Sequence, residues 1–115
     1  MGVVCPLVSE DIEKTRPFPQ NEEFNPISLA IERCLGLSPE NEHEQVKVFN
    51  VSLMIGKNLF KLSKQVQNWI KEYDYYCDRT TYKMRGIVYL FNDNIPPLRA
   101  LVIDFPNKIV RFEGE

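Results

Sequence analysis

The chain has 115 residues, of which 43% are hydrophobic and 26% are charged, and its net charge is −2. This length suits one domain with a buried core, and these fractions are ordinary for a globular protein rather than a disordered or fibrous one. The longest apolar runs span only a few residues, so the sequence predicts no bilayer-spanning helix, and we expect no secretory signal.

Residues 1–24 are predicted to be an extended, proline-containing segment that precedes the folded domain. The prolines within residues 16–20 fix their own φ and push the preceding residues out of the α region. The apolar residues among positions 3–8 favour a short edge strand. Phe18 and Phe24 are expected to pin the segment to the domain.

A helix is predicted after this segment, because Asn25 suits the N-cap, Pro26 the first helical position and Gly36 the end. One face of this helix is apolar: Ile27, Ala30, Ile31, Cys34 and Leu35. We therefore expect about ten helical residues that dock through a single stripe.

The only histidine follows in an acidic loop, residues 38–44. The tripeptide Glu42-His43-Glu44 contains metal-ligating residue types, but neighbours on a flexible loop do not converge their side chains. No distant group of His or Cys residues completes a site. The sequence therefore predicts no metal site and no cofactor.

Three cysteines cannot all pair within one chain. Cys34 and Cys77 fall on predicted apolar helix faces, where a free thiol behaves as a small hydrophobe, and Cys5 stands in irregular sequence. None is near another in the sequence, so we predict neither a metal-type nor a redox-type pair. A reducing, cytosolic compartment fits this pattern.

Residues 46–55 alternate between apolar and polar side chains and are predicted to form one strand. Gly56 then turns the chain into a long amphipathic helix, residues 57–76, which we expect to organise the domain. Its apolar face consists of Leu59, Leu62, Val66, Trp69, Ile70 and Tyr73. Its opposite face carries a lysine stripe, namely Lys57, Lys61, Lys64 and Lys71.

Three strands are predicted after this helix, at residues 81–91, 98–105 and 108–113, separated by turn-forming clusters. If Phe105 pairs with Lys108, then Ile103 faces Val110 and Leu101 faces Phe112 on the side expected to bury Trp69. The other side carries Lys83, Arg85, Ile87, Tyr89, Phe91, Leu98, Ala100, Val102, Ile109 and Arg111.

These elements predict a single α+β domain, residues 25–115, with the order α-β-α-β-β-β. Its long helix is expected to pack on a mostly antiparallel sheet of about four strands that ends in a C-terminal meander. The second side of this sheet is too apolar to be left in water, yet it is studded with basic residues. Such a departure from local rules is where function tends to show.

No Gly-rich phosphate loop, Gly-x-Ser-x-Gly or His-Glu-x-x-His motif occurs. We therefore favour a non-catalytic protein-protein interaction module, such as a small adaptor, inhibitor or regulatory subunit, that binds a protein partner or a second copy of itself. The residues expected to carry binding are Lys57, Lys61, Lys64, Lys71, Lys83, Arg85, Ile87, Tyr89, Phe91, Val102 and Arg111.

The alternative is a nucleic-acid-binding protein, in which the lysine stripe contacts phosphates and Tyr89 and Phe91 stack on bases. The acidic pI of about 5.5 argues against it, because such domains are usually basic. An enzyme of unknown class is the second alternative. The sequence indicates neither a membrane partner nor a small-molecule ligand.

Overall fold

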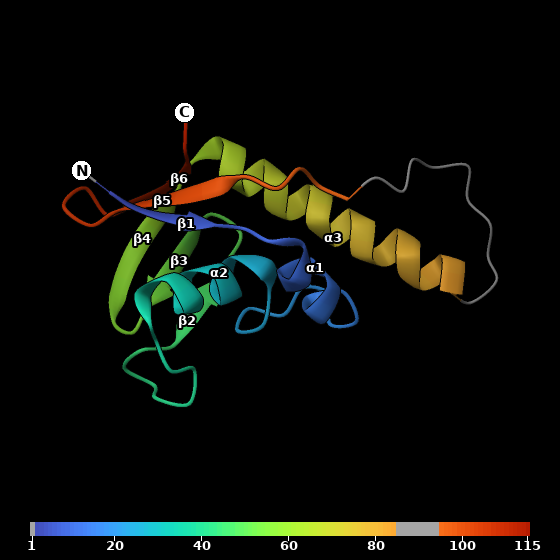
Figure 1. The fold of residues 1–115 in the computed structure, drawn as a ribbon, viewed down its shortest axis with the longest axis horizontal. Helices are drawn as coiled ribbons and strands as arrows, with labels where there is room; N and C mark the ends of the chain where they lie inside the picture. Colours follow the sequence, from blue (N-terminus) through green and yellow to red (C-terminus); the bar gives the residue numbers. More distant parts are fainter. Residues whose placement is uncertain (1, 85–94) are drawn as a thin grey trace.

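A curled sheet forms the centre of the part of the chain that the computed structural model describes, residues 2–84 and 95–115 (Figure 1). Within these residues the elements are β1 (Val3–Pro6), α1 (Ser9–Thr15), α2 (Pro26–Leu35), β2 (Val46–Val48), β3 (Ser52–Ile55), β4 (Asn58–Leu62), α3 (Lys64–Met84), β5 (Ala100–Asp104) and β6 (Ile109–Phe112). The six strands lie in the order β1-β5-β6-β4-β3-β2. The chain is thus a small single α+β domain.

The details of the sheet differ from the sequence prediction. The order α-β-α-β-β-β and the four strands are wrong, because the described residues form three helices and six strands. The strand pairs are antiparallel except for β4 with β6, which run parallel. The chain between these two parallel strands contains α3 and β5, so it crosses from one strand to the next through a helix.

The β5–β6 hairpin has the predicted register. Leu101 pairs with Phe112 and Ile103 pairs with Val110, and all four side chains are fully buried. Alternation and the turn at residues 105–108 were sufficient signals, because a slip of one residue would have moved these side chains to the other face. The strands themselves are shorter than predicted.

Helix α2 also begins and ends as the sequence predicts. The Asn25 side chain accepts a hydrogen bond of 2.9 Å from the Ser28 backbone N–H, and Pro26 occupies the first turn. Gly36 ends the helix with a φ of 66°, a left-handed conformation that costs glycine little.

The segment before α3 is the largest error of the sequence prediction. Residues 46–55 form two strands, β2 and β3, and β4 occupies positions predicted to be helical. Ile55 pairs with Asn58 around the turn at Gly56. Gly56 has a φ of 59°, and a Cβ on it would lie 2.2 Å from the His43 carbonyl oxygen. Only glycine fits this turn, so the hairpin replaces the first two turns of the predicted helix.

The N-terminal residues are not an extended segment ahead of the domain. The predicted short edge strand is present as β1, which pairs antiparallel with β5, whereas α1 is helical where extended backbone was predicted. Thr15 of α1 hydrogen-bonds through its hydroxyl group to the Tyr73 hydroxyl group of α3. Phe18 and Phe24 contact each other, with ring centroids 5.6 Å apart, and Phe18 remains exposed.

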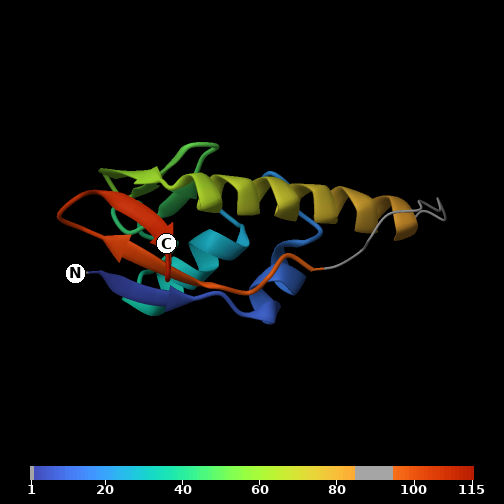
Figure 2. The same ribbon diagram turned by 90° about the horizontal axis from the view of Figure 1, so that it is seen from above.

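Helix α3 projects beyond the sheet (Figures 1 and 2). It continues to Met84, so the predicted strand at residues 81–91 is wrong for residues 81–84, and residues 85–91 lie outside the described residues. Trp69 is 3% exposed, as predicted, and its ring lies 6.4 Å from that of Phe112. The indole Nε1 donates a 2.8 Å hydrogen bond to the Pro97 carbonyl.

Helix α2 contacts both edge strands of the curled sheet, β1 and β2, and so closes the gap between them (Figure 2). Along β1, the Cys34 thiol donates to the Val4 carbonyl and the Arg33 guanidinium donates to the Pro6 carbonyl, at 3.2 and 2.8 Å. An uncovered edge would present such groups to another chain. Side chains of α2 therefore protect the edge at β1.

Candidate interaction surface

Side chains alternate between the two faces of the sheet, and the face opposite the core is exposed or half-buried across β4, β6, β5 and β1, except at Val102. Ladder pairs join Lys61 to Ile109, Arg111 to Val102, and Val102 to Val4 on this face. With Leu59, two residues before Lys61 on β4, these side chains make up the outer patch: Val4, Leu59, Lys61, Val102, Ile109 and Arg111. Its apolar members include Leu59 and Val4, which are 59% and 45% exposed.

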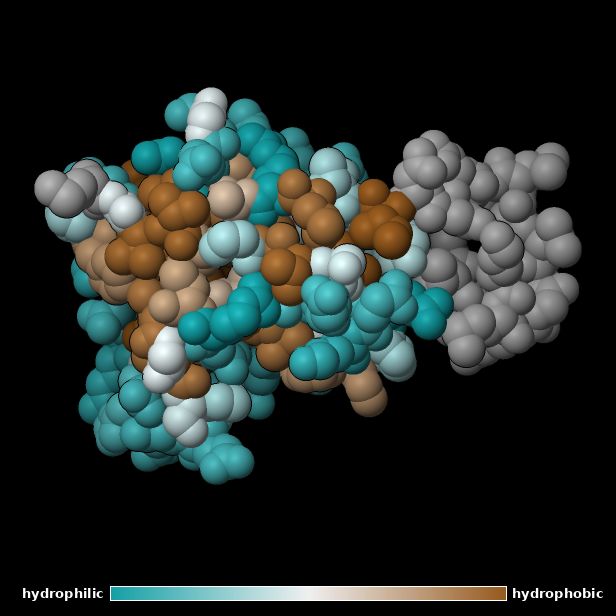
Figure 3. Space-filling view, in the orientation of Figure 1, coloured by the Kyte–Doolittle hydropathy of each residue, from teal (hydrophilic) through white to brown (hydrophobic). Residues whose placement is uncertain are grey.

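Val102 is the buried member of the outer patch. It is 5% exposed, because the chain at Gly2 lies against it, and a Cβ on Gly2 would be 2.4 Å from Val102 Cγ1. Figure 3 shows hydrophobic residues gathered over β1 and β5 on the side seen there. The exposed β1 residue Val4 therefore takes the place that the sequence analysis assigned to Val102.

The outer patch contains two cations, Lys61 and Arg111. Neither Lys61 nor Arg111 takes part in an ion pair among the described residues. Asp104, which pairs with Ile109 across the hairpin, is engaged elsewhere, because its carboxylate accepts hydrogen bonds from the side chain and backbone of Asn107. These bonds lower the pKa of Asp104. The patch thus combines exposed apolar area with the cations Lys61 and Arg111, and the charge of Arg111 contributes to the lowered pKa of Asp104.

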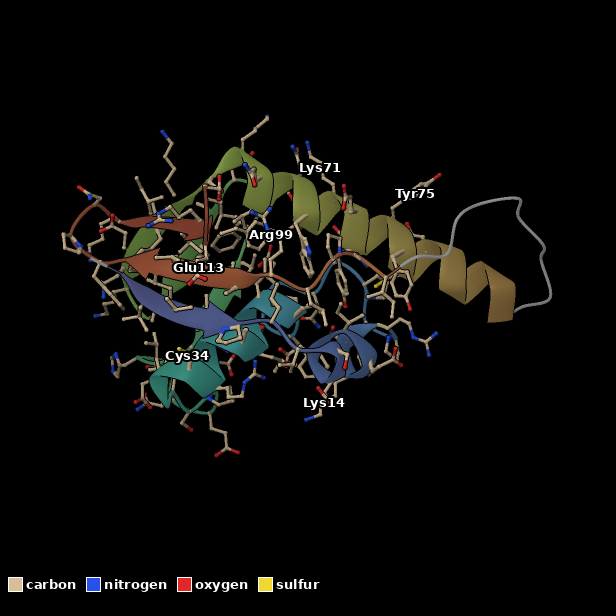
Figure 4. The ribbon with its side chains drawn as sticks, turned by 45° about the horizontal axis from the view of Figure 1, so that its top comes forward. Lys14, Cys34, Lys71, Tyr75, Arg99 and Glu113 are labelled. Atoms are coloured by element: carbon tan, nitrogen blue, oxygen red, sulfur yellow. The ribbon has the colours of Figure 1, made fainter. Side chains whose placement is uncertain are left out.

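The predicted lysine stripe does not lie on one helix. Lys57 is in the β3–β4 turn and Lys61 is on β4, so only Lys64 and Lys71 lie on α3 among the four. Figure 4 shows Lys71 and Tyr75 projecting from α3 away from the sheet. The sequence analysis predicted the stripe because it extended the periodicity of the helix back to residue 57, through residues that form a turn and β4.

The remaining predicted binding residues cannot be placed on this surface. Lys83 belongs to α3, but its side chain lies outside the described part of the structure. Four further residues also lie outside the described residues, namely Arg85, Ile87, Tyr89 and Phe91. The outer patch therefore retains Lys61, Val102 and Arg111 of the predicted set.

A hollow of about 420 Å³, which the sequence did not indicate, lies between the start of α2, the β2–β3 loop and α3. Its lining includes Phe49, Trp69 and the carboxyl groups of Glu22 and Asp74, and none of the described residues that line it is Lys or Arg. Burial, and then the charge of Asp78, raise the pKa of Asp74. The lining comes from three separate segments, so no local motif could have revealed it.

The comparisons with known proteins give no family for this chain. No family model matches the sequence, and no curated protein and no solved structure is significantly similar to it. Within the described residues, no group of three or more His, Cys, Asp or Glu is arranged to hold a metal ion. Nor does any helix there have both the length and the apolar character needed to cross a membrane.

Proposed function

We propose that this protein is a non-catalytic interaction module that binds a partner protein through the outer patch. The observation that supports this proposal is the exposure of Leu59 and Ile109, at 59% and 36%, beside two cations outside the described ion pairs. A monomer gains nothing by leaving such side chains in water, whereas a partner would desolvate them.

The chemistry of the outer patch indicates which residue types a partner would present to it. An apolar centre flanked by Lys61 and Arg111 is complementary to a surface with its own apolar residues and with Asp or Glu at the rim. Burial of the apolar area would supply most of the affinity, and the charges would supply orientation and association rate. The lysines of α3, Lys64 and Lys71, are exposed on a separate element and would add at most a peripheral contact.

The test is affinity capture from an extract of the native cell with three matched proteins. The wild type is compared with the double variant Leu59→Ser/Ile109→Ser, in which the outer patch loses its apolar centre. The control is Lys64→Gln/Lys71→Gln, which changes exposed residues away from the patch. We expect a protein that the wild type and the control retain and that the patch variant loses, with the affinity then measured by calorimetry.

Two results would contradict the proposal. One is an identical set of captured proteins for the wild type and the patch variant. The other is capture that disappears after nuclease treatment and weakens log-linearly with salt, which would favour the nucleic-acid alternative. Sedimentation of the purified protein identifies a second copy as the partner, if the wild type dimerises and the patch variant does not.

A further inference from the structure

Two of the three cysteines meet where α2 closes the edge of the sheet. Cys5 of β1 is fully buried, and Cys34 of α2 is partly exposed. The Cys34 thiol lies 3.2 Å from the carbonyl oxygen of Val4, which belongs to the peptide group that joins Val4 to Cys5. Figure 4 shows Cys34 on α2 beside β1. The Cys34 sulfur atom therefore lies against the peptide group that directly precedes Cys5.

The two thiol groups also interact with each other. Burial, and then a hydrogen bond with the Cys34 side chain, raise the pKa of Cys5 to about 12. Both cysteines are free thiols in this structure. The expectation that no redox-type pair exists considered only cysteines close in sequence, whereas the fold brings Cys5 and Cys34 near each other by placing α2 against β1.

We propose that Cys5 and Cys34 form a redox-modification site, which reacts with a low-molecular-weight disulfide such as oxidised glutathione and closes to a Cys5–Cys34 disulfide. In the first step the Cys34 thiolate attacks one sulfur of the oxidant, forms a mixed disulfide and releases one glutathione thiolate. In the second step the Cys5 thiolate attacks the Cys34 sulfur and releases the second glutathione. The protein gives up two electrons and two protons, and the oxidant becomes two thiols.

The surroundings assign the two roles. Cys34 is the attacking thiol because it is the accessible one of the pair, whereas Cys5 is fully buried. Cys5 is the resolving thiol, and the positive charge of Arg33 only partly offsets the burial that raises its pKa. The third cysteine, Cys77, is buried on α3 beside Tyr73 and is left out of the reaction.

The product would join β1 covalently to α2. The hydrogen bonds from Cys34 and Arg33 to the carbonyls of β1 already hold this junction, and a disulfide would make it independent of them. Such a bond also restricts the unfolded chain, so the oxidised protein should be more stable than the reduced one.

The experiment exposes the full chain to oxidised glutathione, blocks the remaining thiols and measures intact mass and non-reduced peptides. We expect the wild type and Cys77→Ser to lose two hydrogens without gaining glutathione, and a Cys5–Cys34 peptide to appear. Cys5→Ser should stop at one bound glutathione, and Cys34→Ala should not react. The thermal midpoint of the oxidised wild type should rise by about 5 °C or more.

The wild-type peptide map is decisive even if a variant fails to fold. Stable glutathione adducts on wild-type Cys34, dimers linked through Cys34, or no reaction at all would each overturn the proposal. So would an oxidised protein whose thermal midpoint is unchanged or lower, because the bond would then not fit the native junction.

Discussion

The two faces of the sheet are built from the same strands and differ in what covers them. On β6, Val110 points to the inner face and is fully buried, while its neighbour Ile109 points outward and is 36% exposed. On β4, Phe60 is 1% exposed and Leu59 is 59% exposed. Residues from all three helices join the core on the inner face.

This difference separates the residues that stabilise the fold from the residues that we propose to bind a partner. Burial of apolar area stabilises the fold only where another element removes that area from water, so the inner face should carry most of the free energy of unfolding. The outer patch has similar residue types but little burial. Substitutions on the two faces should therefore have very different effects, and the following predictions test that.

The largest effect is expected from Trp69→Ala on α3. The substitution removes a side chain that is 3% exposed, stacks on Tyr73 and contacts Phe112. We expect it to lower the free energy of unfolding by about 3–5 kcal/mol, a large part of the total for a domain of this size. Denaturant unfolding measures the change.

Trp69→Phe is the matched control for this prediction. It keeps an aromatic ring and loses the hydrogen bond to the Pro97 carbonyl. Its cost should be clearly smaller than that of alanine, because most of the buried area is retained. Equal and small costs for both variants would show that the inner face does not depend on this side chain.

A pH-dependent effect of intermediate size is expected at Glu32 on α2. This residue is 7% exposed, and burial raises the pKa of its carboxyl group to about 7 from its ordinary value of 4.5. Between these two pH values the folded state keeps a proton that the unfolded state has released. The contribution of Glu32 to stability is therefore present at low pH and is lost as the pH rises through about 7.

Glu32→Gln isolates this contribution, since glutamine does not titrate. We expect the variant to gain stability relative to the wild type as the pH increases from about 4.5 to about 7. Urea unfolding of both proteins at each pH measures the difference between their free energies of unfolding. The contributions of the other carboxyl groups cancel in this difference. Parallel curves for the two proteins would mean that Glu32 is solvated in the folded state.

The smallest effect is expected from Leu59→Ser on the outer face. Because Leu59 is 59% exposed, the free energy of unfolding should change by no more than about 0.5 kcal/mol. The matched inner-face change is Phe60→Ser, at the next position of β4, which should destabilise the domain severely. If the Leu59 variant unfolds as readily as the Phe60 variant, the two faces are not distinct.

The sequence was sufficient to predict the structure where a local pattern of residues fits only one conformation. Asn25, Pro26 and Gly36 can hardly be arranged except as the ends of a helix, and the hairpin register followed from alternation around residues 105–108. The coarse α+β class followed from these same elements.

The other parts of the fold depend on contacts that cannot be read from the spacing of residues in the sequence. Leu59, Leu62 and Val66 are spaced as on a helix, yet the first two belong to a strand, and the decisive signal was the two-residue turn of Gly56 and Lys57. Val8 occupies the N-cap of helix α1, where its side chain cannot accept a hydrogen bond, and the Asp11 carboxylate accepts one from the Val8 backbone N–H instead. Strand alternation placed Val102 and Arg111 correctly on one face of the β5–β6 hairpin, whereas Lys61 was predicted on a helix and lies on β4.

The pairing of β1 with β5 has a consequence for biosynthesis. Val3 lies opposite Ile103, so the first strand to be made has no partner until nearly one hundred further residues have been added. At about 5–20 residues per second, that interval is about 5–20 s on the ribosome. During it, β1 and the Cys5 thiol remain uncovered by the sheet. Any chaperone or oxidant present during this interval has access to the strand before β5 does.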